Sequence, residues 1–145
     1  MSIRIMGVDY GEKRVGLALS DPLGITAQPL ECIERENDAQ VAGELERLIQ
    51  THDIEHVVVG LPVNLSGNDS PQTKRARRFI SRLRKNLGVK IETWDERLSS
   101  DEAERALIDM DVRRSRRKER RDIVAAQLIL QGYLDTKGPA KALYS

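Results

Sequence analysis

The segment from His56 to Leu61 constrains the fold of this chain more than any other. It reads His-Val-Val-Val-Gly-Leu, so apolar residues occupy consecutive positions instead of alternating with polar ones. This pattern is typical of a parallel strand whose two faces are both covered by helices. An apolar helical stripe with capping residues at Asn37 and Asp38 precedes the segment, and a helix from about Gln72 to Asn86 is expected after it. The segment is therefore expected to lie inside a sheet flanked by helices.

Strand patterns on either side of this segment define the rest of the sheet. Alternating residues from Ile3 to Asp9, a turn, and Val15 to Ser20 together predict a hairpin. A third strand is expected from Ile25 to Ile33, at an edge of the sheet because Pro29 lacks an N–H group for a central ladder. The fifth strand is expected from Val89 to Trp94.

Two helices are expected after the fifth strand. The first is short and is capped by Ser99 or Ser100, and the second runs from about Lys118 to Asp135. The resulting order βββ-α-β-α-β-α-α predicts an α/β fold with a mixed five-stranded sheet flanked by helices. The 145 residues suit one domain, which we place at residues 1–137, with a C-terminal tail at 138–145.

Composition indicates a cytoplasmic protein. The longest apolar runs are far shorter than the ~20 residues of a membrane-spanning helix, so no membrane association is expected. The strand pattern begins near the first residue, so we expect no signal peptide. The single cysteine, Cys32, cannot form an internal disulfide bond, which favours the cytosol.

The charge is balanced over the whole chain but not along it. Residues 72–121 contain 17 Lys or Arg and 9 Asp or Glu, whereas the remainder contains 7 basic and 14 acidic residues. The basic residues concentrate in two stretches, Lys74–Lys85 and Arg113–Arg121. This asymmetry indicates a surface that binds a polyanion, although a solvated, highly charged helix face is the alternative.

Acidic residues lie at similar structural positions in distant parts of the chain. Asp9 ends the first strand, Asp95 and Glu96 follow the fifth strand, and Asp122 lies near the start of the last helix. If the first and fifth strands are parallel, Asp9 and Glu96 emerge at the same edge of the sheet. Carboxylates grouped in this way suit Mg²⁺ or Mn²⁺, and two such ions can activate water and stabilise the leaving oxygen of a phosphodiester.

Each of these residues also has a simpler explanation. Asp9 fits an ordinary turn position, Asp95 or Glu96 can pair with Arg97, and Asp122 suits the dipole of a helix N-terminus. Trp94 fits a core position better than a platform for base stacking. His52 and His56 are interpreted as surface residues, because their spacing spans a junction between helix and strand.

Four segments in this order span nearly the whole chain and carry a family resemblance: Gly7–Asp21, Val58–Pro62 with Asn64 and Gly67, Asp95–Ser100, and Asp122–Gln131. They resemble the motifs of the YqgF family, also called RuvX. The resemblance implies an RNase H-like fold and a nuclease that uses carboxylates and divalent metal. It also implies that the catalytic and metal-binding acids are Asp9, Glu96 and Asp122, with Asp95 as a further candidate ligand.

The resemblance also suggests substrates. Bacterial members of the family are described as nucleases that mature the 5′ end of pre-16S rRNA, and as Holliday junction resolvases. The nearly two-fold symmetric junction would favour a homodimer. The basic residues expected to hold the nucleic acid are Lys13, Arg14, Arg97, Arg113, Arg114, Arg116, Arg117 and Lys118.

Two other functions fit part of the sequence. An actin-like or sugar-kinase ATPase would share the hairpin with Asp9, Gly11 and Gly16, but such enzymes need a second domain. A non-catalytic RNA-binding assembly factor would account for the basic stretches alone. Aromatic residues make up only 3% of the chain, which favours recognition of the nucleic-acid backbone over base stacking.

Overall fold

The computed structural model describes residues 4–62, 69–96 and 118–139. The short helix expected after Ser99 or Ser100 lies outside the described residues. The same holds for most of the expected basic contacts, namely Arg97, Arg113, Arg114, Arg116 and Arg117.

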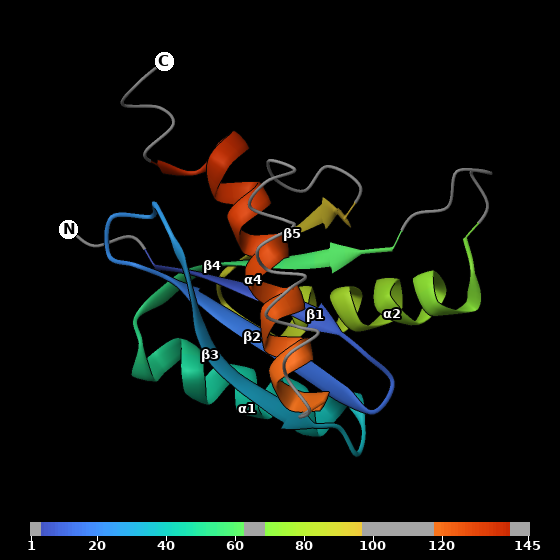
Figure 1. Ribbon diagram of the computed structural model, residues 1–145. Coiled ribbons are helices and arrows are strands. Elements are labelled where there is room, and N and C mark those ends of the chain that lie inside the picture. The colour runs from blue at the N-terminus through green and yellow to red at the C-terminus, as the bar shows by residue number, and fades with distance from the viewer. Residues whose placement is uncertain (1–3, 63–68, 97–117, 140–145) are drawn as a thin grey trace.

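Five strands form one mixed sheet in the order β3-β2-β1-β4-β5 (Figure 1). β1 pairs in parallel with β4, which pairs in parallel with β5, whereas β1–β2 and β2–β3 are antiparallel. The predicted mixed five-stranded sheet is therefore confirmed. The strands are β1 (Arg4–Tyr10), β2 (Arg14–Ser20), β3 (Ala27–Glu34), β4 (Ile54–Leu61) and β5 (Lys90–Asp95).

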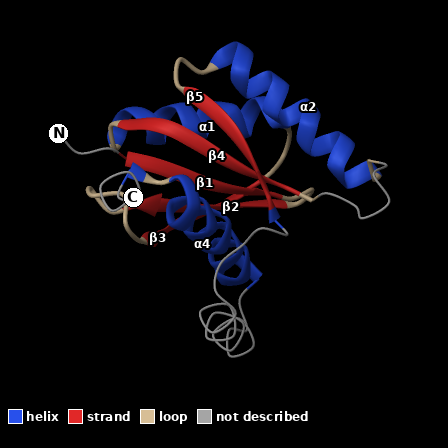
Figure 2. Cartoon of the chain, turned by 90° about the horizontal axis from the view of Figure 1, so that it is seen from above, coloured by secondary structure: helices blue, strands red, loops and turns tan. Residues whose placement is uncertain are grey.

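Helices cover both faces of the sheet. Figure 2 shows α1 (Asp38–Thr51) and α2 (Pro71–Asn86) on one side and α4 (Lys118–Lys137) on the other. Side chains alternate along each strand, so Met6 and Val8 of β1 pack toward α1 and α2, while Ile5 packs toward α4. The central run Val57–Val59 is fully buried between these layers, as its apolar sequence predicts.

Side chains at the helix N-termini explain where α1 and α2 begin. The Asn37 side chain accepts a hydrogen bond from the backbone N–H of Gln40, and Ser70 does the same for Thr73. Pro71 fits the first turn of α2, where its missing N–H group costs nothing. Both helices start with the capping chemistry that Ser, Asn and Pro favour.

The third strand begins later than the sequence pattern suggests. The carboxylate of Asp21 accepts hydrogen bonds from the N–H groups of Ile25 and Thr26, which holds these residues in the β2–β3 turn. Pairing therefore starts at Ala27 instead of Ile25. Pro29 does lie on an edge strand as expected, next to a register shift in the β2–β3 ladder.

One interpretation of the histidines is wrong, because His56 is buried and not on the surface. Its ring contacts that of Tyr133 edge-on, and its Nε2 lies 3.3 Å from a carboxylate oxygen of Glu92. β4 begins at Ile54, so His56 belongs to the strand and faces α4 instead of occupying a junction. Trp94 is 3% exposed and packs in the same cluster, which confirms it as a core residue.

The last helix extends to Lys137, slightly beyond its expected end. Gly138 closes it by donating its N–H group to the carbonyl oxygen of Leu134. Within the residues described, no helix is long and apolar enough to cross a membrane.

Candidate active site

The parallel strands bring two of the predicted acidic residues to the same edge of the sheet. β1, β4 and β5 run in the same direction, so their carboxyl ends lie together. Asp9 is close to the end of β1, and Glu96 directly follows β5. Alternation along β1 directs Asp9 to the face that α4 covers, because Tyr10 packs on the opposite face.

Glycines on this face allow Glu96 and α4 to approach Asp9. Gly16 is the register partner of Asp9 on β2, and a Cβ atom built there would overlap the carbonyl oxygen of Asp122. On the other side, Gly60 follows Val59, the last residue of β4 that pairs with β1, and a Cβ atom at Gly60 would lie 2.9 Å from Oε1 of Glu96. Asp9 therefore lies between two strands whose missing side chains make room for Glu96 and for the start of α4.

The charges of Glu96 and Asp122 act on Asp9. Burial, followed by these two negative charges, raises the pKa of Asp9 from 3.8 to about 7. Burial, followed by the charge of Asp95, also raises the pKa of Glu96. Grouped carboxylates destabilise one another unless a cation lies among them, so this arrangement favours the binding of a positive ion.

Arg14 supplies a positive charge to this group. Its Nε donates a hydrogen bond to Oδ2 of Asp122 over 2.8 Å, and each side chain is about a quarter exposed, at 27% and 28%. This bond links the start of β2 to the start of α4 across 108 residues of sequence. Arg14, predicted as a contact for nucleic acid, thus contacts a predicted metal ligand in the protein alone.

The donor set fits a hard divalent cation, although the side chains are not yet arranged around one. Carboxylate oxygens are the ligands that Mg²⁺ and Mn²⁺ prefer. Among the described residues, no three Asp, Glu, His or Cys side chains are grouped closely enough to hold a metal ion as they stand. Asp122 instead directs one carboxylate oxygen to the guanidinium group of Arg14.

The other predicted site residues that the structure describes lie around this edge. Lys13 is exposed in the turn between β1 and β2, and Lys118 is exposed at the first position of α4. Asp95 is on β5 next to Trp94, so alternation directs it to the opposite face from the α4 cluster. The roles predicted for these residues remain predictions.

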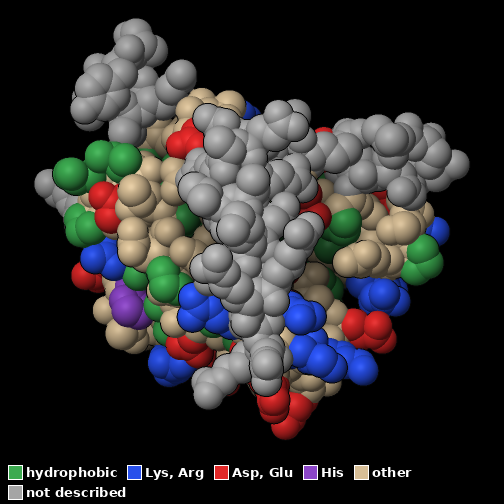
Figure 3. Space-filling model, viewed as in Figure 1, with side chains coloured by type: hydrophobic (Ala, Val, Ile, Leu, Met, Phe, Trp, Pro, Cys, Tyr) green, Lys and Arg blue, Asp and Glu red, His purple; other side chains and the backbone are tan. Residues whose placement is uncertain are grey.

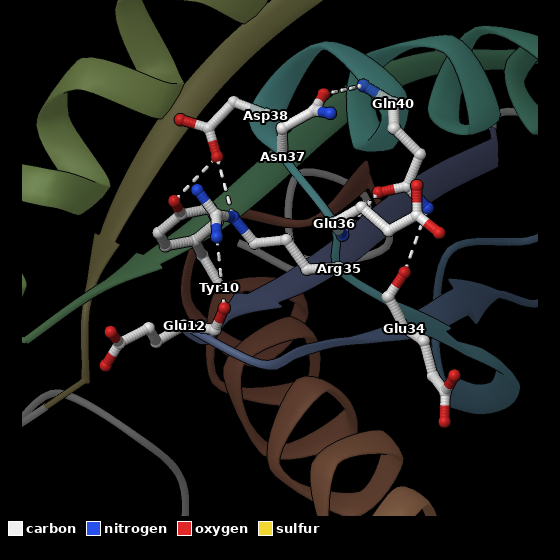
Figure 4. Close-up of polar contacts among 8 residues, drawn as sticks. All are labelled: Tyr10, Glu12, Glu34, Arg35, Glu36, Asn37, Asp38 and Gln40. Atoms are coloured by element: carbon white, nitrogen blue, oxygen red, sulfur yellow. Dashed lines mark hydrogen bonds and ion pairs between the residues drawn. The ribbon is translucent and has the colours of Figure 1, made fainter.

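A polar network on the opposite face holds the turn that follows Asp9 (Figure 4). The Tyr10 hydroxyl and the Arg35 Nε both donate hydrogen bonds to Oδ1 of Asp38, at 2.7 and 2.9 Å. Arg35 also donates to the carbonyl oxygen of Glu12, and its guanidinium lies over the Tyr10 ring. The end of β1 is thereby fixed to the start of α1, which limits the movement of Asp9.

Neither the glycines nor the Arg14–Asp122 pair was predicted from the sequence as part of this site. Gly7, Gly16 and Gly60 all face α4, and a side chain at any of them would collide with this helix. Glycines within strand patterns are a recognised signal of close backbone approach, so this feature was accessible from the sequence. The ion pair was not, because it joins two distant segments.

Comparison with known proteins identifies the family. A family profile described as "RuvX: Holliday junction resolvase" matches residues 3–136. A protein of Halothermothrix orenii is 47% identical over 92% of this chain and 95% of its own length, and one of Myxococcus xanthus is 44% identical over 98% and 94%. Both are named "Putative pre-16S rRNA nuclease". This chain belongs to the RuvX family.

Solved structures of resolvases share the fold of this RuvX protein. RuvC of T. thermophilus in complex with a Holliday junction substrate matches with a TM-score of 0.61 and 14% identity, over 93% of this chain and 96% of that one. The fowlpox virus Holliday junction resolvase matches with a TM-score of 0.60 and 19% identity, over 92% and 99%. The predicted RNase H-like fold is therefore confirmed.

Membership of the RuvX family also confirms the predicted enzyme class, a nuclease that acts on nucleic acid. The carboxylates at the sheet edge are ligands of the kind that a nuclease using divalent metal needs.

Proposed function

We propose that this RuvX protein is a metal-dependent endonuclease that hydrolyses phosphodiester bonds during maturation of the 5′ end of pre-16S rRNA. The observation that carries the proposal is the position of Asp9, whose pKa of about 7 reflects burial together with the nearby charges of Glu96 and Asp122. The names of the relatives that match nearly the whole chain support the choice of substrate.

The residues at the site have separate tasks in this proposal. Asp9, Glu96 and Asp122 would hold Mg²⁺ or Mn²⁺, in a site for two ions, with Asp95 as a further candidate. The bound metal would supply activation of water and stabilisation of the leaving oxygen. The rigid end of β1 would keep the Asp9 carboxylate in place during hydrolysis. A carboxylate that is already positioned does not have to be reoriented, which lowers the activation free energy of hydrolysis.

Arg14 has two tasks in the same proposal. In the protein alone it neutralises part of the charge on Asp122. If the Asp122 carboxylate held a metal ion instead, the guanidinium would be available at the same edge, next to exposed Lys13. Both side chains would then contact phosphates of the strand to be cut, while Lys118, Arg97, Arg113, Arg114, Arg116 and Arg117 would hold the flanking backbone.

We further infer that residues 1–137 form the nuclease domain, with 138–145 as a tail, and that the enzyme acts in the cytoplasm, where precursor rRNA is processed in bacteria. The second candidate substrate is a four-way DNA junction, which the family description and the RuvC fold favour. A homodimer would suit this substrate, because the junction is nearly two-fold symmetric. A non-catalytic assembly factor is the third candidate.

Cleavage assays distinguish these functions. Purified wild-type protein and Asp9→Asn are incubated with precursor rRNA and with a synthetic four-way junction, each with Mg²⁺, with Mn²⁺ or with EDTA. We expect cleavage of the precursor by the wild type with metal, and loss of cleavage but not of binding in Asp9→Asn. Equal cleavage by both proteins would refute the role of Asp9, and cleavage of the junction alone would replace RNA as the substrate.

A further inference from the structure

Helix α2 carries a basic surface that the proposed active site does not use. Its 16 residues, Pro71–Asn86, include seven Lys or Arg and no Asp or Glu. Its buried side faces the sheet through Ala76, Phe79, Ile80 and Leu83, so the cations occupy the outer side. They are Lys74, Arg75, Arg77, Arg78, Arg82, Arg84 and Lys85.

Part of this surface has no acidic partner among the residues that the structure describes. Arg77 pairs with Asp69 over 2.7 Å, and Arg75 lies 3.9 Å from Glu12. In the described part of the chain, no ion pair includes Arg78, Arg82 or Lys85, which are exposed and follow one another at helical spacings of four and three residues. We call these three residues the α2 basic row.

The side chains around the α2 basic row are basic or neutral and polar. An open hollow of about 440 Å³ is lined by Arg77, Arg78, Ser81, Arg82, Lys85 and Asn86, and none of these residues is acidic. Cations at helical spacings of three and four residues repel one another and destabilise the helix. An anion with regularly spaced charges would remove this repulsion, and the phosphate backbone of a nucleic acid has such charges.

The first turns of α2, which precede the row, lie near the proposed active site. α2 starts shortly after β4, at the sheet edge where Asp9 lies, and the contact of Arg75 with Glu12 joins its first turns to the β1–β2 turn. From there the helix extends for about 24 Å, at ~1.5 Å per residue. Figure 2 shows that it runs along the face opposite α4, so an occupant of this surface would contact a different side of the sheet from the cleavage site.

We propose that the α2 basic row binds the backbone of paired RNA that flanks the cleavage site. The inference rests on the proposed function, which supplies RNA as the substrate. Paired RNA fits better than a single strand, because stacking on aromatic side chains is typical of single-strand binding and the only aromatic residue of α2, Phe79, is fully buried. A rigid row of cations suits recognition of shape and phosphate in a duplex.

The test compares two triple variants with the same change in charge. The first replaces Arg78, Arg82 and Lys85 with Gln. The matched control replaces Arg47, Lys90 and Lys137 with Gln, since these exposed cations lie on α1, β5 and the end of α4. Both are made in the Asp9→Asn background and assayed in EDTA, and urea denaturation checks that each retains the stability of its parent.

Binding is measured with a blunt RNA duplex between about 50 and 200 mM salt. We expect the slope of log affinity against log salt to fall by roughly two to three units in the α2 variant, and affinity to weaken on the order of tenfold, with little change in the control. Equal slopes for the two variants would overturn the proposal. The same measurement is made with single-stranded RNA and with a DNA duplex. If the α2 variant loses as much affinity for single-stranded RNA, or loses affinity only for the DNA duplex, the assignment to paired RNA is overturned.

This outcome is independent of catalysis. The binding assay needs neither metal nor cleavage, so a difference between the two variants supports the α2 surface even if the wild type cuts no RNA. Conversely, a wild-type protein that cleaves precursor rRNA while both variants bind alike would retain the proposed function and lose this surface.

Discussion

Replacing Asp9 with Asn is expected to stabilise the metal-free protein at alkaline pH. The carboxyl group titrates near pH 3.8 in an unfolded chain but near pH 7 in the folded protein, because burial and then the charges of Glu96 and Asp122 disfavour its ionised form. Between these values the folded state binds more protons than the unfolded state, so stability falls as the pH rises. Above about pH 7 the full penalty is present, and the Asn variant avoids it.

The size of the effect follows from the pKa. A change from 3.8 to about 7 corresponds to about 4 kcal/mol, at about 1.36 kcal/mol per pH unit. Because Asp9 keeps some contact with solvent, we expect about half of this, ~2 kcal/mol, as the gain in the free energy of unfolding at pH 8. For a domain of this size, that gain raises Tm by about 4–8 °C.

Urea denaturation in EDTA from pH 5 to pH 8 measures this gain. The difference between Asp9→Asn and the wild type should grow from pH 5 to about pH 7 and then level off. Asp21→Asn is the matched control: burial acts to raise the pKa of Asp21, but N–H groups of Thr26 and Ile25 outweigh it and lower the pKa. That variant should be less stable than the wild type at neutral pH. If Asp9→Asn shows no gain at pH 8, the carboxylates are not held together as described.

Two further predictions concern the contacts around this carboxylate. Gly16→Ala should reduce the free energy of unfolding by about 2–3 kcal/mol in urea denaturation, because the added Cβ overlaps the backbone of Asp122. Gly43 lies at an exposed position of α1 with no atom near its Cβ position, so Gly43→Ala should increase the free energy of unfolding by about 0.5–1 kcal/mol. Similar values for the two would contradict the close packing of α4 on β2. Arg14→Ala should bind Mn²⁺ severalfold more tightly in calorimetric titration, because Asp122 no longer pairs with a guanidinium group, and Arg14→Lys should stay near the wild type. Weaker binding by Arg14→Ala would show that the guanidinium supports the metal site instead of competing with it.

The sequence predicts the sheet well because its signals are local. The consecutive apolar residues Val57–Val59 indicate a central parallel strand, and Pro29 indicates an edge strand. Once the parallel order is known, Asp9 and Glu96 must emerge at one edge, so the proximity of these two residues follows from topology. No single side-chain contact needs to be known for that step.

What the sequence could not give is the pairing of side chains between distant segments. The interaction of Arg14 with Asp122 depends on how α4 packs on β2, and His56 was misjudged because the start of β4 was placed two residues too late. The unpredicted ion pair and the wrong interpretation of His56 both concern the α4 face of the sheet. The sequence of α4 gives its apolar side, but not the strand on which its first turn lies.

The glycines of the strands hold that missing information. Asp9 is flanked in the sheet by Gly16 on β2 and by Gly60 on β4. Gly60 lies one residue beyond Val59, where the pairing of β4 with β1 ends. Any side chain at these positions would occupy the volume that the backbone of Asp122 and the carboxylate of Glu96 now fill. Both glycines lie beside Asp9 on the face of the sheet that α4 covers. Because they have no side chains, the start of α4 can pack close enough to β2 to place Asp122 near Asp9. Close packing at these two glycines thus keeps Asp9 within reach of the negative charges of Glu96 and Asp122, an arrangement that destabilises the ionised form of Asp9 in the metal-free protein and favours a bound cation.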